Sequence, residues 1–123
     1  MGKKIIKSSK SSLTLRLADT NDMRTIYEWR NNKTIVDLSL SGLTVDWKEH
    51  SSWFQKALVS NDIVLFVIQI INPKCEAIEI GEIRFDRLSN NTAEVTIFIM
   101  PDYEGFGYGS TALDRGCRQM FIE

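Results

Sequence analysis

The clearest signal in this chain is the stretch Pro101-Asp102-Tyr103-Glu104-Gly105-Phe106-Gly107-Tyr108-Gly109-Ser110-Thr111. An alternating apolar run at 93–100 precedes it and a helical apolar pattern at 112–121 follows it, which predicts a strand, a glycine-rich turn and a helix N-terminus. Its three glycines leave backbone N–H groups uncovered by side chains. The first turn of the helix adds unpaired N–H groups and the positive end of the helix dipole. The stretch therefore predicts an anion site, most naturally for a phosphate.

Other interpretations of the glycines are weaker. A dinucleotide-binding fingerprint needs a third glycine where Ser110 stands, and it normally lies in the first strand–helix unit. A P-loop needs a Lys before its Ser or Thr, whereas Gly109 is followed directly by Ser110 and Thr111. A purely structural interpretation stays open, in which the glycines only provide tight geometry between a strand and a helix.

Length and composition predict one domain. The chain has 123 residues, of which 43% are hydrophobic and 25% charged, and this is enough apolar material for a core. The net charge of -1 gives no sign of a nucleic-acid partner, and no stretch is long enough to cross a membrane. Cys75 and Cys117 match no metal spacing. We expect a cytoplasmic protein without a metal, with a disordered leader at 1–12 and a single domain at 13–123.

Hydrophobic periodicity predicts the elements before the glycine stretch. Alternating leucines at 13, 15 and 17 indicate a strand, and Asp19 can cap a helix that runs to Arg30. The segment 34–43 is ambiguous between a helical turn and a loop. Asp46 starts a second amphipathic helix that reaches residue 58. Three strands follow as a meander at 63–71, 78–88 and 93–100, with a bulge expected at Gly81.

This order and the glycine stretch resemble the GNAT superfamily of N-acetyltransferases. The acyl-CoA pyrophosphate loop of that family has Arg or Gln, two residues, Gly, one residue, then Gly or Ala. Here Gly107 and Gly109 occupy the glycine places, whereas Glu104 stands in the Arg or Gln place, where a carboxylate repels a pyrophosphate. The resemblance covers residues 13 to 121. It implies an α/β (α+β) fold of the GNAT-like acyl-CoA N-acyltransferase type, with a mixed, mainly antiparallel sheet and helices on both faces.

Three further segments resemble the branch that contains ribosomal-protein (RimJ/RimL-type) and aminosugar acetyltransferases. They are Trp29-Arg30-Asn31, Trp47-Lys48-Glu49-His50 and Gly81-Glu82-Ile83-Arg84-Phe85-Asp86. Members of the family continue with another strand and helix after the helix at which this chain ends. The resemblance therefore implies the front part of an acetyltransferase, and pairing with a second copy that completes the sheet is plausible.

The resemblance also implies a reaction and a set of site residues. Acetyl-CoA is the expected cosubstrate, and the acetyl group is expected to pass directly to a primary amine of a small molecule, an aminosugar or a protein N-terminus. A non-catalytic acyl-CoA-binding remnant and an interaction module of the same fold stay as alternatives. By position, the backbone of Ile99 and Met100 is expected to meet the pantetheine arm. The diphosphate is expected to bind to Gly105, Phe106, Gly107, Tyr108, Gly109 and Ser110.

Two carboxylates are candidates for the general base that deprotonates the amine. Glu94 begins the strand that leads to the glycine stretch, and Glu82 lies on the neighbouring strand. Burial among apolar neighbours raises a carboxyl pKa, although either residue could instead pair with a basic side chain or face solvent. His50 is more typical of a satisfied core histidine than of a base. Trp29 and Arg30 on the first helix are the expected contacts of the acceptor.

Overall fold

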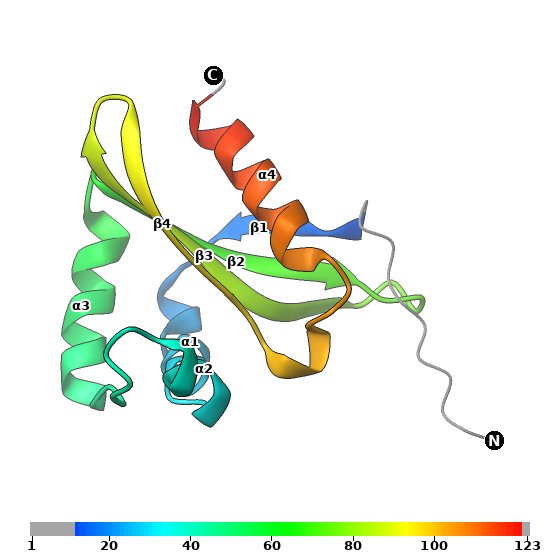
Figure 1. Ribbon diagram of the computed structural model, residues 1–123, viewed down its shortest axis with the longest axis horizontal. Helices are drawn as coiled ribbons and strands as arrows, with labels where there is room; N and C mark the ends of the chain where they lie inside the picture. Colours follow the sequence, from blue (N-terminus) through cyan, green and yellow to red (C-terminus); the bar gives the residue numbers. More distant parts are fainter. Residues whose placement is uncertain (1–11, 122–123) are drawn as a thin grey trace.

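The computed structural model describes residues 12–121 (Figure 1). Its elements follow one another in the predicted order. They are β1 (Thr14–Leu17), the 3-10 turn η2 (Thr20–Asp22), α1 (Met23–Arg30), α2 (Lys33–Leu38), α3 (Trp47–Val59), β2 (Ile63–Ile71), β3 (Ala77–Ser89), β4 (Thr92–Ile99), the 3-10 turn η3 (Pro101–Tyr103) and α4 (Tyr108–Phe121). No helix in this part of the chain is long and apolar enough to cross a membrane.

The four strands form one sheet in the order β1-β2-β3-β4, and each pairs antiparallel with its neighbour. Chain order and spatial order coincide because short turns join β2 to β3 and β3 to β4. The central strand β2 is rich in β-branched residues, which suits a position covered on both faces. The strand β4 is the last of the described sheet, so one of its edges has no neighbouring strand among residues 12–121.

Helices cover the two faces of the sheet and create two apolar cores (Figure 1). The helix α4 covers one face, where Ile68, Ile83 and Phe85 are buried with Ala112. On the other face α1 and α3 pack through Ile26 and Phe54 onto β2. The side chains of a strand alternate between its faces, so the polar residues of β3 and β4 that lie opposite α4 point towards α1 and α3.

A bulge in β3 shifts the phase of this alternation. Ile68 pairs with Gly81 while Gln69 pairs with Glu79, which leaves Ile80 as the extra residue. A Cβ at Gly81 would lie 2.2 Å from the carbonyl oxygen of Phe98, so only glycine fits here. The bulge was expected at this glycine. Because of the extra residue, Glu79 and Glu82 point to the same face of the sheet although they are three positions apart.

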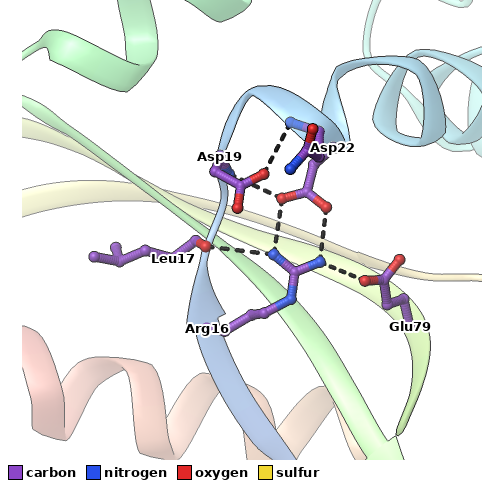
Figure 2. A network of polar contacts seen from close by, with 6 residues as sticks. Arg16, Leu17, Asp19, Asp22 and Glu79 are labelled. Atoms are coloured by element: carbon purple, nitrogen blue, oxygen red, sulfur yellow. Dashed lines mark hydrogen bonds and ion pairs between the residues drawn. The ribbon is translucent and has the colours of Figure 1, made fainter.

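Figure 2 shows the polar network that fixes the start of α1 on that face. The Arg16 guanidinium donates to both carboxylate oxygens of Asp22, at 2.8 and 2.7 Å, and it also contacts Glu79. Asp22 in turn accepts the backbone N–H of Asp19, which caps the turn η2 as expected. The network joins β1, β3 and the helix that carries Trp29 and Arg30.

One helix boundary differs from the sequence-based expectation, and one ambiguous segment is resolved. The helix α4 starts at Tyr108 rather than at residue 112, so Gly109 and Ser110 belong to its first turn and not to a loop. Of the two interpretations left open for residues 34–43, the helical one holds for the first part, because the short helix α2 covers residues 33–38; its N-cap Asn32 accepts the N–H of Thr34 at 3.0 Å. The expected leader at 1–12 lies outside the described residues except for its last position.

Candidate functional site

A groove of about 1020 Å³ runs along the free edge of β4. One wall is the backbone and side chains of β4, and the opposite wall is α2 with the first residues after it. The glycine stretch and the first turn of α4 close one end. Its lining comprises Ile35, 38–41, 95–99, 103–105, 107–110 and Leu113. A mostly apolar groove of this size with polar groups at one end is typical of a ligand site.

The glycine end of the groove presents backbone N–H groups. Gly105 and Gly107 have φ angles of 86° and 83°, a conformation that favours glycine, and they turn the chain from η3 into α4. The first helical hydrogen bond of α4 runs from the Thr111 N–H to the Gly107 carbonyl at 3.2 Å. The N–H groups of Gly109 and Ser110 therefore lack an intrahelical acceptor, and both residues line the groove at the positive end of the helix dipole.

Most of the residues predicted to bind the cofactor line this groove. They are Ile99, Gly105, Gly107, Tyr108, Gly109 and Ser110. Met100 and Phe106 do not line it. The Met100 N–H donates to the Ile80 carbonyl oxygen at 2.7 Å, and the Met100 carbonyl oxygen accepts the Tyr103 N–H at 2.9 Å. Both polar groups of its backbone are therefore paired within the protein. Phe106 packs against the core under α4. Glu104 is exposed at the lip of the groove.

Glu82 is a buried carboxyl on the sheet face that α1 and α3 cover. Its side chain is 2% exposed, and Oε1 has no hydrogen-bond partner in the described part of the chain. Burial raises the pKa of Glu82 to about 7, against the opposing charges of Arg84 and Arg30, while Asp86 raises it further. A carboxyl in this state changes protonation close to neutral pH, as a general base for an amine requires.

Glu94 does not share this environment. It is exposed near the start of β4, where it stands opposite Asp86 in the ladder. Of the alternatives left open for Glu94, the solvent-facing one holds, and burial gives no reason to choose Glu94 as the base.

The first turn of α3 and the last turn of α1 meet beside Glu82. The Arg30 Nη1 donates to His50 Nδ1 at 3.0 Å, and His50 Nε2 lies 2.8 Å from the Met23 carbonyl oxygen. A guanidinium only donates, so Nδ1 is the acceptor and Nε2 carries the proton. Burial lowers the pKa of His50; the Met23 hydrogen bond opposes this shift and the Arg30 charge adds to it. His50 is thus a neutral, fully paired core histidine, as expected.

Aromatic rings connect this cluster to the groove. Arg30 lies 4.9 Å and Arg84 5.1 Å from the ring centre of Trp53. Trp29 meets Phe98 edge-on at 6.2 Å between ring centres. Phe98 lines the groove and also stands opposite Glu82 in the ladder between β3 and β4. The expected acceptor contacts Trp29 and Arg30 therefore lie on the Glu82 side of β4, close to the groove.

Sequence reasoning did not select two members of this cluster as site residues, namely Arg84 and Phe98. The alternation of β3 does place Glu82 and Arg84 on one face, but the pairing of α1 with α3 has no local signal. No group of three or more His, Cys, Asp or Glu side chains within residues 12–121 could hold a metal ion.

Comparison with known proteins places these features in a family. The family model described as "Acetyltransferase (GNAT) domain" matches residues 12–123. The spermidine N-acetyltransferase from Vibrio cholerae, solved in complex with CoA and spermine, superposes with a TM-score of 0.75 at 23% identity. That match covers 91% of this chain and 65% of the enzyme, so the chain spans less than two thirds of its length.

A domain from Methanocaldococcus jannaschii is similar to a comparable extent, with a TM-score of 0.72 at 20% identity, over 92% of this chain and 71% of that domain. At such identities these structures establish the fold alone. No curated protein matches the sequence.

Proposed function

The chain belongs to the GNAT family of acetyltransferase domains, and on that premise we propose that it transfers the acetyl group of acetyl-CoA to a primary amine. The acceptor class is a small molecule, an aminosugar or a protein N-terminus, and the amine attacks the thioester directly. The observation that carries this proposal is the groove along β4, which ends in the N–H groups at the start of α4.

The groove fits the two parts of an acyl-CoA. At the glycine end, the N–H groups of Gly109 and Ser110 suit a diphosphate, because the missing side chains at Gly107 and Gly109 let the backbone approach the anion. Along β4, the apolar residues Val95, Ile97 and Ile99 line the groove, where they suit the pantetheine arm. Acetyl-CoA supplies the thioester, and the protein orients it beside the edge of β4.

Glu82 is the proposed general base. The amine must lose a proton as it attacks, and a carboxyl with a pKa of about 7 can accept that proton at neutral pH, directly or through a water molecule. Phe98 pairs with Glu82 in the ladder, lines the groove and contacts Trp29, so Trp29 and Phe98 are the proposed residues that align the acceptor. Glu94 stays a second candidate for the base and is compared with Glu82 in the assays below.

Isothermal titration of the purified chain with acetyl-CoA, CoA and ADP tests the first step. We expect saturable binding of all three ligands, because all three carry the diphosphate. Gly107→Glu should weaken acetyl-CoA binding at least about tenfold, since it places a charged side chain at the diphosphate site. Gly42→Glu is the matched control: Gly42 also has a positive φ, of 64°, but does not line the groove.

A screen of amines with the same protein tests the second step. Acetylation of an amine supports the transferase. Binding of acetyl-CoA without turnover of any amine supports the acyl-CoA-binding alternative. If a folded chain binds neither acetyl-CoA nor ADP, the proposed function is wrong, and an interaction module of the same fold becomes the better explanation.

A further inference from the structure

Arg30 is a partly buried guanidinium for which the structure provides no carboxylate partner. Within residues 12–121, the hydrogen bond to His50 is the one recorded for it, and no salt bridge within 4 Å involves it. A guanidinium carries five N–H donors, so most of the donors of Arg30 are free for another acceptor. By contrast, Arg16 on the same face of the sheet contacts two carboxylates.

Two neighbours hold the Arg30 guanidinium in place. His50 is fully buried and fixed by its own bond to Met23, so the nitrogen that accepts from Arg30 cannot move freely. The ring of Trp53 lies under the guanidinium at 4.9 Å. A positively charged fork that is oriented before the ligand arrives loses little entropy on binding, and its planar geometry matches a carboxylate or a phosphate.

Two groups of opposite charge in this cluster, the Arg30 guanidinium and the Glu82 carboxyl, lack a full set of partners among the described residues. Arg84 shares the Trp53 ring but donates to Asp86 at 2.9 Å, so its charge is partly compensated. Glu82 is influenced by both arginines, yet its Oε1 has no hydrogen-bond partner. The cluster thus contains one guanidinium without a carboxylate and one carboxyl oxygen without a donor. A molecule with both an anionic group and an amine would complement both.

Building on the proposed function, we propose that Arg30 recognises an anionic group of the acceptor, a carboxylate or a phosphate, while Glu82 serves the amine. His50 and Trp53 act as positioning residues for Arg30. The acceptor is then an amine that carries a negative charge nearby. A polyamine has no anionic group for Arg30, and its additional positive charges are repelled by two guanidiniums.

Matched acceptors test this assignment. Glucosamine 6-phosphate against glucosamine compares a phosphate with none, and β-alanine against β-alaninamide compares a carboxylate with none; spermidine represents the polycations. We expect kcat/KM at least about tenfold higher for the anionic member of at least one pair, with spermidine the poorest acceptor. The pair that shows the difference identifies the anion. Equal kcat/KM within both pairs, or a preference for spermidine, would overturn the proposal.

Variants connect the preference to Arg30. In Arg30→Met the ratio between the members of the preferred pair should fall to about one, and Arg30→Lys should restore part of it. Arg118→Met, which removes an exposed guanidinium on α4, is the control that keeps the ratio. If Arg30 served only as a counter-charge for Glu82, Arg30→Met would shift the pH profile of the reaction but leave the ratio intact, and the proposal would fall.

A measurement without turnover separates this proposal from the proposed function. His50 is the only histidine of the chain and touches Arg30, so the ¹⁵N resonances of its ring report on this site. Titration with inorganic phosphate or acetate should shift them saturably in the natural chain and in Gly107→Glu, but not in Arg30→Met. A shift that persists in Arg30→Met, or is absent from the natural chain, contradicts the anion site. Failure of acetyl-CoA to bind would contradict only the proposed function.

Discussion

Two clusters of charged side chains lie on the same face of the sheet, and β3 contributes one glutamate to each. In the first, Arg16 contacts both Asp22 and Glu79. In the second, the charge of Arg30 lowers the pKa of Glu82 and the charge of Glu82 raises the pKa of Arg30, although the two form no ion pair among the described residues. The first cluster has its hydrogen bonds satisfied within the protein and fastens α1 to the sheet. The second leaves polar atoms without partners, which is the arrangement that suits a ligand.

The two clusters shift carboxyl pKa values in opposite directions. Burial alone would raise the pKa of Asp22, but the hydrogen bonds from Arg16 and from the Asp19 N–H outweigh it and lower that pKa. For Glu82, burial outweighs the two arginines and the pKa rises to about 7. The difference teaches that direct hydrogen bonds to a carboxylate, more than nearby positive charge, determine whether it stays ionised.

Glu82→Gln should have the largest effect. Loss of a general base lowers turnover by roughly 10² to 10⁴-fold, which steady-state kinetics with any acceptor found in the amine screen would measure. Glu79→Gln is the control from the other cluster on the same strand, and it should change stability rather than kcat. A larger loss of turnover in Glu94→Gln than in Glu82→Gln would show that the base has been assigned to the wrong strand.

The difference in stability between the natural chain and Glu82→Gln should depend on pH. The pKa of Glu82 is about 7 in the folded chain and near 4.5 in a free side chain. Folding therefore favours the protonated form, and the natural chain loses up to about 3 kcal/mol of unfolding free energy as pH rises from 4.5 to 7. Glu82→Gln lacks this loss, so urea unfolding should find its relative stability rising over that range and constant above it.

The groups around Glu82 define the control for this measurement. Arg30 comes from α1, Arg84 and Asp86 come from β3, and His50 of α3 is neutral and paired. Replacing Arg30 by Met removes one of the charges that oppose the shift, so the pH-dependent loss should begin at the same pH but extend to higher pH. A loss over the same pH range in both proteins would mean that Arg30 does not act on Glu82.

Asp22→Asn should disrupt the first cluster, in which Arg16 contacts Asp22 and Glu79, and should lower stability by less than the change described for Glu82. It removes the charge that Arg16 binds, and because Arg16 is partly exposed we expect a loss of about 2 kcal/mol at pH 7. The lowered pKa of Asp22 means that its contribution is present above about pH 4, the ordinary range of an Asp, and is lost below it. Urea unfolding measures the loss; a difference that persists at pH 2 would contradict the electrostatic explanation.

Glu104→Gln should give the smallest effect, a change in acetyl-CoA affinity, because solvent screens the charge of an exposed carboxylate. Removing an exposed carboxylate from the lip of the groove should tighten acetyl-CoA binding by about two- to fivefold, and less at high salt. Asp62→Asn is the control, since this exposed carboxylate in the turn between α3 and β2 does not line the groove. Titration calorimetry at two salt concentrations distinguishes the two variants.

Most of the fold could be predicted because its signals are local. Asp46 accepts the N–H groups of Lys48 and Glu49 as an N-cap should, and the strands follow their alternation. The start of α4 could not be predicted, since Gly109 and Ser110 are poor helix formers that α4 nevertheless includes. The six-residue helix α2 was ambiguous because so short a pattern fits a helical turn or a loop.

The candidate site also has one part with a local sequence signal and one part without it. The glycine end of the groove is continuous in sequence, so its residues could be predicted together. Glu82 and Glu94 could not be ranked, because alternation places both on one face and only the covering helices decide which one is buried. The association of Arg30, His50 and Trp53 depends on the packing of α1 against α3, which no short-range pattern encodes.

The extra residue Ile80 determines what the deletion of one residue from β3 would change. In a regular strand, side chains three positions apart point to opposite sides, so Glu79 would face the apolar layer under α4. Deleting Ile80 alone would remove the bulge, and Glu79 would keep both its place opposite Gln69 and its side of the sheet. Because the Ile80 carbonyl also holds the Met100 N–H at 2.7 Å, the same deletion would displace the end of β4. Ile80 thus matters for the attachment of β4 and for the groove beside it, and not for the side of the sheet on which Glu79 lies.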